Sequence, residues 1–341
     1  MTGFRPFLGV SAPNKLFLAA NPLYWAASRV HAWWLSARAR PAPDLPLIIV
    51  GALRSGGSGK TSVTAALALA LRARGLKVGI LAWRVGPGSG RGPAEPVAAD
   101  ANWRLWSDEA VLLARETGCP VFATRDRAAA WRQIARMPGA PFDVLVSDDG
   151  FQDLRLRGAL RLLLAAPGES PGPLDLLPGG PFRETAPARA RADLVLEGPL
   201  AGDAPIGDPG PSRPSPPVHP FRRRFLAPAT APDQAWVALA ALGDAAPFLA
   251  DLDRSGIRPR AVVRGPNHGP LPMRRLAAVL AGIPGARGIC TAKEAVRLEG
   301  AGEPPMAIAG QEILLAPETL GFLAEFLDRR AGNSAETKLV H

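Results

Sequence analysis

The stretch VGALRSGGSGKTSVTAALALALRARG, residues 50–75, places a glycine-rich turn between an apolar segment and a long amphipathic run. The apolar residues 45–50 predict a short buried strand, and residues 61–74 predict a helix. A glycine-rich turn in this position lets successive backbone N–H groups and the helix N-terminus surround a phosphate group. The sequence therefore predicts a phosphate-binding loop.

This loop matches most of the nucleotide-binding pattern G-x-x-x-x-G-K-[ST]. Gly59, Lys60 and Thr61 occupy the last three positions, whereas Arg54 stands where the pattern has its first glycine. Lys60 supplies positive charge for phosphates, and the Thr61 hydroxyl is placed to reach Mg²⁺. We expect a nucleoside triphosphate to bind here. The predicted nucleotide-binding residues are Ser55, Gly56, Gly57, Ser58, Gly59, Lys60, Thr61 and Ser62.

Apolar and amphipathic stretches alternate along the first 200 residues, which predicts an α/β fold with a parallel sheet wound with helices. Composition changes at residues 199–232, where proline and glycine exclude long regular elements, with a little extended structure near 221–226. A second, smaller α/β lobe begins with a strand at 235–243. Strands are predicted at 77–83, 120–123, 143–147, 160–166 and 192–198, and helices at 108–117, 125–137, 247–255, 273–281 and 318–330.

These patterns divide the chain into five parts. We predict an N-terminal membrane-associating helical segment with an amphipathic helix at 1–42, a P-loop domain at 43–200 and a Pro-rich linker at 201–233. A C-terminal α/β domain at 234–332 and a disordered tail at 333–341 complete the chain.

Carboxylates stand at two places where ligands are expected. Asp148 and Asp149 end a predicted buried strand, and the carboxyl ends of parallel strands line the ligand crevice of a wound sheet. One of these two carboxylates is expected to approach Mg²⁺. Asp108 and Glu109 begin a predicted helix, where an N-cap role for Ser107 or Asp108 is the favoured interpretation from the residues alone.

Charge and cysteine content narrow the possible partners. The formal net charge of +10 indicates an anionic partner. The basic residues are scattered without interleaved aromatic side chains, so we do not expect nucleic-acid binding. The two cysteines, Cys119 and Cys290, form no C-x-x-C pair, which argues against a disulfide framework or thiolate zinc site and favours a reducing compartment.

Residues 22–37 predict a helix rich in tryptophan, with Trp25, Trp33 and Trp34 beside Arg29. Polar residues interrupt its apolar run, so the segment is neither a signal peptide nor a membrane-spanning helix. Two interpretations remain. The helix lies in the headgroup layer of an anionic bilayer, or it packs on the protein with its tryptophans in the core.

Taken together, the motifs resemble those of the tetraacyldisaccharide 4'-kinase family, the lipid A kinases of Gram-negative bacteria. The likeness extends over residues 45–296 and keeps the family's motif order. The segments that carry it are GGSGKT (56–61), DEAVLLA (108–114), DR (126–127), SDDGFQ (147–152), LLPGGPFRE (176–184), RAD (191–193), ALAALGD (238–244), NHG (267–269) and TAKEAV (291–296).

The resemblance implies Mg²⁺-dependent transfer of the ATP γ-phosphate to the 4'-hydroxyl of a tetraacyldisaccharide 1-phosphate lipid, giving a 1,4'-bisphosphate. It also implies a peripheral or monotopic enzyme, which we expect to be monomeric, on the cytoplasmic face of the bacterial inner membrane, whose anionic surface is a partner.

Residue roles follow from the same resemblance. Asp108 matches the catalytic base, assisted by His268, and Lys60 acts on the phosphates. From the sequence alone, His268 in RGPNHGP is better interpreted as an exposed loop histidine. The implied metal and phosphate-transfer residues are Thr61, Glu109, Asp148 and Asp149, and the implied polar active-site residues are Arg84, Arg127, Gln152, Arg183 and Glu184.

The sequence departs from the family pattern at six positions, namely Val85, Asp153, Asn267, Gly269, Ala292 and Glu294. Two other classes of function are therefore kept as alternatives. One is a soluble P-loop NTPase of metal-insertion or cofactor-maturation type, although its usual Cys/His clusters and N-K-x-D motif are missing. The other is an inactive paralogue that acts as a scaffold.

Overall fold

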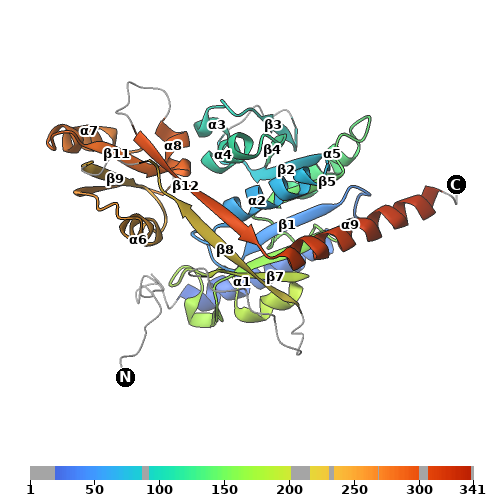
Figure 1. Ribbon diagram of the computed structural model, residues 1–341. Coiled ribbons are helices and arrows are strands. Elements are labelled where there is room, and N and C mark those ends of the chain that lie inside the picture. Colours follow the sequence, from blue (N-terminus) through green and yellow to red (C-terminus); the bar gives the residue numbers. More distant parts are fainter. Residues whose placement is uncertain are drawn as a thin grey trace.

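The computed structural model describes residues 20–86, 92–200, 216–229, 234–267, 269–298 and 306–338 (Figure 1). Its strands are β1 (Leu47–Ala52), β2 (Val78–Trp83), β3 (Glu95–Val97), β4 (Val121–Thr124), β5 (Val144–Asp148), β6 (Leu160–Ala165), β7 (Leu194–Leu200), β8 (Val218–Leu226), β9 (Trp236–Ala240), β10 (Ala261–Arg264), β11 (Arg287–Thr291) and β12 (Met306–Leu315). Its helices are α1 (Asn21–Ala37), α2 (Lys60–Ala73), α3 (Trp103–Trp106), α4 (Asp108–Thr117), α5 (Arg127–Ala135), α6 (Ala246–Arg254), α7 (Met273–Ala281), α8 (Ala292–Leu298) and α9 (Pro317–Lys338).

The strands form one sheet in the order β10-β9-β11-β12-β8-β7-β6-β1-β5-β2-β4-β3. Strands β6, β1, β5, β2 and β4 are parallel neighbours, and Val50 of β1 lies opposite Asp148 of β5. The predicted α/β fold is confirmed. We call β1–β7 with their helices the first lobe, and β9–β11 with α6–α8 the second lobe.

Strand β1 is buried on both faces because alternate side chains point to opposite sides of the sheet. Ile48 and Val50 join a core formed with α2, α4 and part of α9, whereas Leu47 and Ile49 pack with α5. The unbroken apolar run before the phosphate loop is thus the signature of a central parallel strand.

The Pro-rich linker predicted at 201–233 was expected to hold only a little extended structure near 221–226, and the strand found there is longer. Residues Val218–Leu226 form the nine-residue strand β8, which pairs parallel to β7 and antiparallel to β12. Pro220 lies within this strand. Strand β12 pairs with β11 through Met306–Ala309 and with β8 through Gly310–Leu315. The two lobes are therefore joined by a continuous sheet.

The C-terminal prediction also needs correction. Helix α9 runs to Lys338, so residues 333–338 continue a helix that was expected to end near residue 330 (Figure 1). The remaining residues 339–341 lie outside the described part of the chain.

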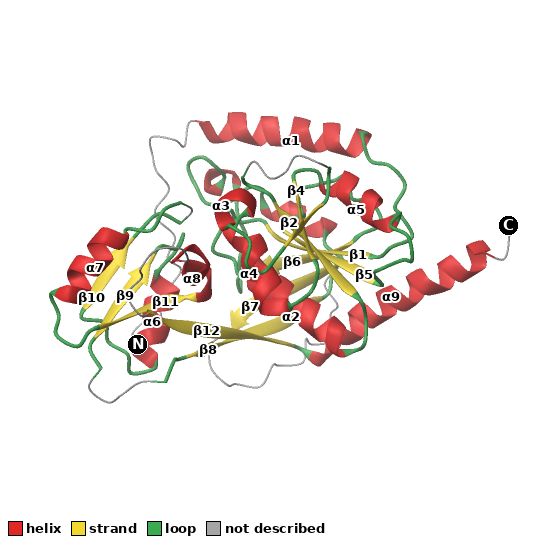
Figure 2. Cartoon of the chain, turned by 90° about the horizontal axis from the view of Figure 1, so that it is seen from above, coloured by secondary structure: helices red, strands yellow, loops and turns green. Residues whose placement is uncertain are grey.

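Helix α1 lies along the edge of the first lobe (Figure 2). Asn21 anchors its start, because the side-chain amide donates to Leu174 O at 3.0 Å and accepts from Gly179 N at 3.0 Å. Trp25, Trp33 and Trp34 are 43%, 71% and 41% exposed. The interpretation that placed these tryptophans in the core is therefore wrong. Within the described residues, no helix is long and apolar enough to cross a membrane.

Gly51 is a position where the fold tolerates no side chain, because an added Cβ would lie 2.4 Å from the Phe151 Cβ. We expect Gly51→Ala to destabilise the protein by roughly 1–3 kcal/mol, since strand β1 and the turn after β5 must separate. Chemical denaturation measures this cost. Gly321→Ala is the control: it meets nothing within 4 Å on helix α9 and should be neutral or stabilising. Equal stability of the two variants would contradict this packing.

Candidate active site

The phosphate loop connects β1 to α2 and depends on glycine at three positions. Gly56, Gly57 and Gly59 have φ angles of +88°, +68° and +75°, a region that other residues rarely adopt. Arg54 is not among the positive-φ residues, and its backbone bridges to Phe182 with its guanidinium over that ring at 5.8 Å. This explains why the first glycine of the pattern is dispensable here.

Helix α2 and strand β5 bring a hydroxyl and a carboxylate together at the carboxyl edge of the sheet. Thr61 Oγ1 donates to Asp148 Oδ2 at 3.0 Å, and Thr64 Oγ1 donates to Asp148 Oδ1 at 3.3 Å. Lys60 Nζ donates to Ser58 Oγ at 3.0 Å within the loop. Hydroxyl and carboxylate oxygens therefore lie next to the loop, together with the Lys60 ammonium.

Asp149 begins a series of polar side-chain contacts that runs through Arg183 and Gln152. It adopts φ +54°, and both of its oxygens accept from Arg183 Nη1, at 2.8 and 2.9 Å. The Gln152 amide links this pair onward, since it accepts from Arg183 at 3.3 Å and donates to Glu184 at 3.0 Å. Arg191 closes the chain by donating to Glu184 at 2.7 Å.

Two further arginines of the predicted site have different surroundings. Arg127 is buried, donates to Asp148 O at 2.8 Å and lies over the Trp83 ring at 5.0 Å. Arg84 forms an ion pair with Glu95 of β3, and this pair is largely buried. The structure therefore brings Arg127 to the β5 end and gives Arg84 a carboxylate partner on β3.

Burial and the neighbouring charges shift the pKa values of the groups at this edge. Burial lowers the pKa of the Lys60 ammonium, although the carboxylates of Asp149 and Asp148 oppose the shift. Burial, followed by the charge of Asp149, raises the pKa of Asp148. Burial opposes ionisation of Asp149, but Lys60 and Arg183 outweigh it and hold the pKa of this group below its usual value. The site thus combines cations with carboxylates in little solvent.

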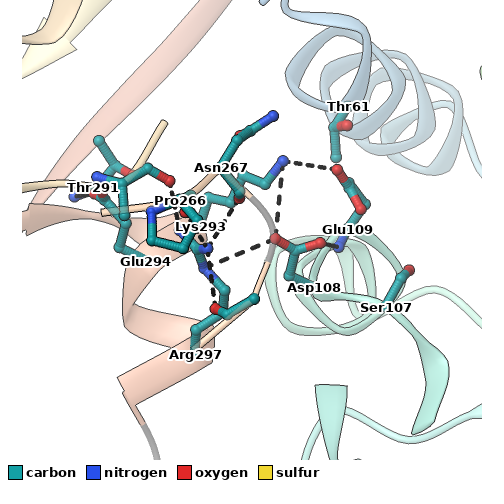
Figure 3. A network of polar contacts seen from close by, with 12 residues as sticks. Thr61, Ser107, Asp108, Glu109, Pro266, Asn267, Thr291, Lys293, Glu294 and Arg297 are labelled. Atoms are coloured by element: carbon teal, nitrogen blue, oxygen red, sulfur yellow. Dashed lines mark hydrogen bonds and ion pairs between the residues drawn. The ribbon is translucent and has the colours of Figure 1, made fainter. Parts of the chain in front are cut away.

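The start of α4 faces the second lobe (Figure 3). Ser107 caps the helix, since its Oγ accepts from Ala110 N at 3.0 Å, and Asp108 and Glu109 follow in the first turn. Lys293 of α8 donates to Glu109 Oε1 at 2.7 Å and lies 3.8 Å from Asp108 Oδ2. The predicted acidic pair is therefore ion-paired across the two lobes. His268 lies outside the described residues.

Glu294 and its neighbours show what a departure from the family pattern does. Helix α8 begins at Ala292, directly after Thr291. Glu294 Oε2 accepts from Thr291 N and Oγ1, both at 2.9 Å. This is the contact made by the N3 acid of a capping box, T-x-x-E. Gly269 has φ +124°, which suits glycine. Val85 is exposed, and Asp153 pairs with Arg155 at 2.8 Å.

Sequence reasoning assigned no role to several residues of this site, among them Lys293, Arg297 and Arg191. Lys293 and Arg297 are four residues apart on α8 and so share one face of the helix. The capping-box pattern at 291–294 predicts where that helix begins. Nothing in the sequence indicates that its cationic face meets α4.

The loop, the Thr61–Asp148 pair and the parallel sheet define a P-loop nucleotide-binding protein. Residues 14–330 match the family model described as tetraacyldisaccharide-1-P 4'-kinase. This match spans most of the chain, and the protein belongs to that family.

Individual relatives agree with this assignment, and a solved structure has a similar fold. The chain is 36% identical over 297 residues to the tetraacyldisaccharide 4'-kinase of Gluconacetobacter diazotrophicus, covering 84% of this chain and 85% of that one. It is 34% identical to the Aeromonas hydrophila enzyme of that name over 257 residues, 74% of each chain. Its fold is similar to Aquifex aeolicus LpxK in complex with ATP, with a TM-score of 0.68 and 23% identity, covering 92% of this chain and 98% of that one.

Lys60 is expected to stabilise negative charge on bound phosphates. Lys60→Ala should lower turnover on the order of 10²-fold or more, because it removes a cation from a site with little solvent. Turnover is followed as ADP release, and thermal unfolding checks that the variant is folded. A folded Lys60→Ala protein with the wild-type rate would contradict the phosphate-site assignment.

Proposed function

We propose that this protein transfers the γ-phosphate of ATP to the 4'-hydroxyl of a tetraacyldisaccharide 1-phosphate lipid, giving a 1,4'-bisphosphate. The observation that carries the proposal is the juxtaposition, within one edge of the sheet, of the phosphate loop, the Thr61–Asp148 pair and Arg183. Family membership favours this reaction over a metal-insertion or cofactor-maturation NTPase. The identity of the lipid acceptor in this proposal comes from the name of its relatives, tetraacyldisaccharide 4'-kinase.

A sugar hydroxyl is a weak nucleophile, so a positioned base is needed. We assign this role to Asp108, which takes the proton of the 4'-hydroxyl as its oxygen forms a bond to the γ-phosphorus. The bond from the γ-phosphorus to the β–γ bridging oxygen breaks, and ADP leaves with its electron pair. Lys60 and Arg183 stabilise the charge on the transferring group. The assistance of His268 stays a prediction.

The residues present fit a Mg²⁺ ion. Hydroxyl and carboxylate oxygens are the ligands this ion prefers, and Thr61 Oγ1 and Asp148 Oδ2 lie 3.0 Å apart. We propose that these two residues hold the ion, with Asp149 and Glu109 nearby. When bound, Mg²⁺ supplies neutralisation of the phosphate charge. The described residues contain no cluster of three or more His, Cys, Asp or Glu side chains suited to a metal.

The product of the reaction tests the proposal directly. Purified protein with ATP, Mg²⁺ and a tetraacyldisaccharide 1-phosphate should yield a lipid heavier by one phosphate group, detected by mass spectrometry. Fragmentation should place the new group on the 4'-oxygen. Lipid-independent ATP hydrolysis with no phosphorylated lipid would favour the metal-insertion or maturation class, and no turnover of any kind would favour a scaffold.

We further propose that α1 binds the anionic inner-membrane surface from the cytoplasmic side, with the protein acting as a monomer and without nucleic acid. Leu23, Val30 and Trp33 are 75%, 66% and 71% exposed on this helix. Near its end, Arg38 and Arg40 line a depression of about 500 Å³ with Arg132. Arg155 also lines this depression and is ion-paired with Asp126 and Asp153, whereas within the described residues no carboxylate is ion-paired with Arg38, Arg40 or Arg132. These three cations suit contact with lipid phosphates.

The exposed tryptophans give this membrane proposal its test. Trp25, Trp33 and Trp34 changed together to Ser should release the protein from phosphatidylglycerol vesicles, since the apolar anchor is removed. Co-sedimentation measures binding, and the apparent KM should rise for lipid but not for ATP. Ile308→Ser, at a position 51% exposed on β12, is the control and should bind normally. Unchanged vesicle binding by the triple variant would exclude α1 as the anchor.

A further inference from the structure

Arg297 is a fully buried cation that belongs to no part of the phosphate loop. It lies on α8 in the second lobe, and its side chain is 0% exposed. Its Nε lies 3.8 Å from Asp108 Oδ2, at the start of α4 in the first lobe (Figure 3). At this distance the contact is an ion pair rather than a hydrogen bond. Burying a guanidinium is costly unless its donors are satisfied, so its other contacts matter.

Those contacts are backbone carbonyls from two other segments of the second lobe. Arg297 Nη2 donates to Ala241 O at 2.7 Å, beyond the end of β9. Its Nη1 donates to Pro266 O at 3.1 Å and Asn267 O at 2.9 Å, with Gly269 O at 3.5 Å. The hydrogen bonds of Nη1 and Nη2 therefore fix the orientation of the planar guanidinium, and its Nε edge faces Asp108.

Glu294 ties the end of β9 to the start of α8. Its Oε1 accepts from Ala241 N, and its Oε2 accepts from Thr291 at the start of α8. The end of β9, the loop residues Pro266, Asn267 and Gly269, and α8 thus form one hydrogen-bonded unit with Arg297 at its centre. This unit meets the first lobe through the carboxylates of α4.

Lys293 differs from Arg297 in how it is held. Its side chain is 23% exposed, and its contacts are the two carboxylates, Glu109 at 2.7 Å and Asp108 at 3.8 Å. A lysine ammonium on a flexible stem is a point charge, whereas the arginine fork fixes direction. Removing Lys293 therefore changes charge near α4 while leaving the hydrogen-bonded unit intact.

We infer that Arg297 is a positioning residue for the transfer reaction: it holds the Asp108 carboxylate in place from the opposite lobe and links it to the backbone of Pro266, Asn267 and Gly269. The inference rests on the proposed function, because the role of Asp108 as base is part of that proposal. A base must lie within hydrogen-bond reach of the hydroxyl, so a small displacement of Asp108 is costly.

The test compares Arg297→Met, Arg297→Lys and Asp108→Asn in steady-state kinetics with ATP and the lipid. Asp108→Asn should lower kcat on the order of 10²–10⁴-fold. Arg297→Met should lower kcat on the order of 10–100-fold, with KM for ATP nearly unchanged, as for other residues that orient a functional group. Arg297→Lys should fall between Arg297→Met and wild type. In the Asp108→Asn background, Arg297→Met should change kcat by less than about threefold.

Arg223→Met is the matched control. It removes an arginine that lies 2.6 Å from a buried aspartate, Asp251 on α6, and this aspartate, like Asp108, keeps a second cation, Arg254. Arg223→Met should keep the wild-type kcat. Equal losses for Arg297→Met with and without Asp108, or wild-type kcat in folded Arg297→Met, would overturn the inference. A variant in which only the KM for ATP rises, with kcat unchanged, would also overturn the inference.

A readout without turnover separates this inference from the proposed function. Hydrogen exchange in Arg297→Lys, which retains the charge, should rise at the amides of residues 108–111 and of Gly265, Asn267 and Gly269, and stay unchanged in Arg223→Met. If exchange is unchanged both at the start of α4 and in the loop that Arg297 contacts, Arg297 does not position Asp108, even if the enzyme is active. An inactive wild type that shows the expected exchange pattern would instead refute only the phosphotransfer proposal. If Arg297→Met fails to fold, Arg297→Lys and Lys293→Met carry the kinetic test, and Lys293→Met should lower kcat less than Arg297→Lys.

Discussion

The parallel pairing of β1 with β5 is the constraint on which this site depends. It sets Val50 opposite Asp148, so the loop that leaves β1 and the carboxylate that ends β5 emerge at the same edge of the sheet. Helix α2 then starts where Thr61 reaches Asp148. The packing of Phe151 on Gly51 holds the two strand ends together, because no side chain fits between them. The backbone pairing of β1 with β5 thus determines which side chains meet at this edge.

Charge at this edge is divided between the lobes. The first lobe supplies Lys60, Arg183 and the carboxylates, and the second lobe supplies two cations on α8 that meet α4. Desolvation strengthens each of these interactions and also makes an unpaired charge expensive, which is why the carboxylates are matched by cations. The continuous sheet through β8 and β12 keeps the lobes in register while α4 and α8 meet.

Helix α1 stands apart from this electrostatic arrangement. Its start is tied to the loop that precedes Arg183 through Asn21, yet much of its apolar surface faces outward. The buried amide contacts give the helix a fixed place on the first lobe without burying its tryptophans. This exposed apolar surface is the one that the proposed membrane contact of α1 would use.

The sequence by itself determined the parts whose signal is local. The apolar run, the glycines and Lys60-Thr61 predicted the strand, loop and helix of the nucleotide site, and α4 and α7 begin and end where periodicity placed them. Tertiary structure decided the rest. Strand β8 extends beyond the stretch expected near 221–226 because two neighbouring strands satisfy its backbone, and α9 runs past its expected end. Lys293 and Arg297 reach α4 only because a separate lobe folds against it, and contacts between residues so far apart in the chain leave no pattern in a single sequence.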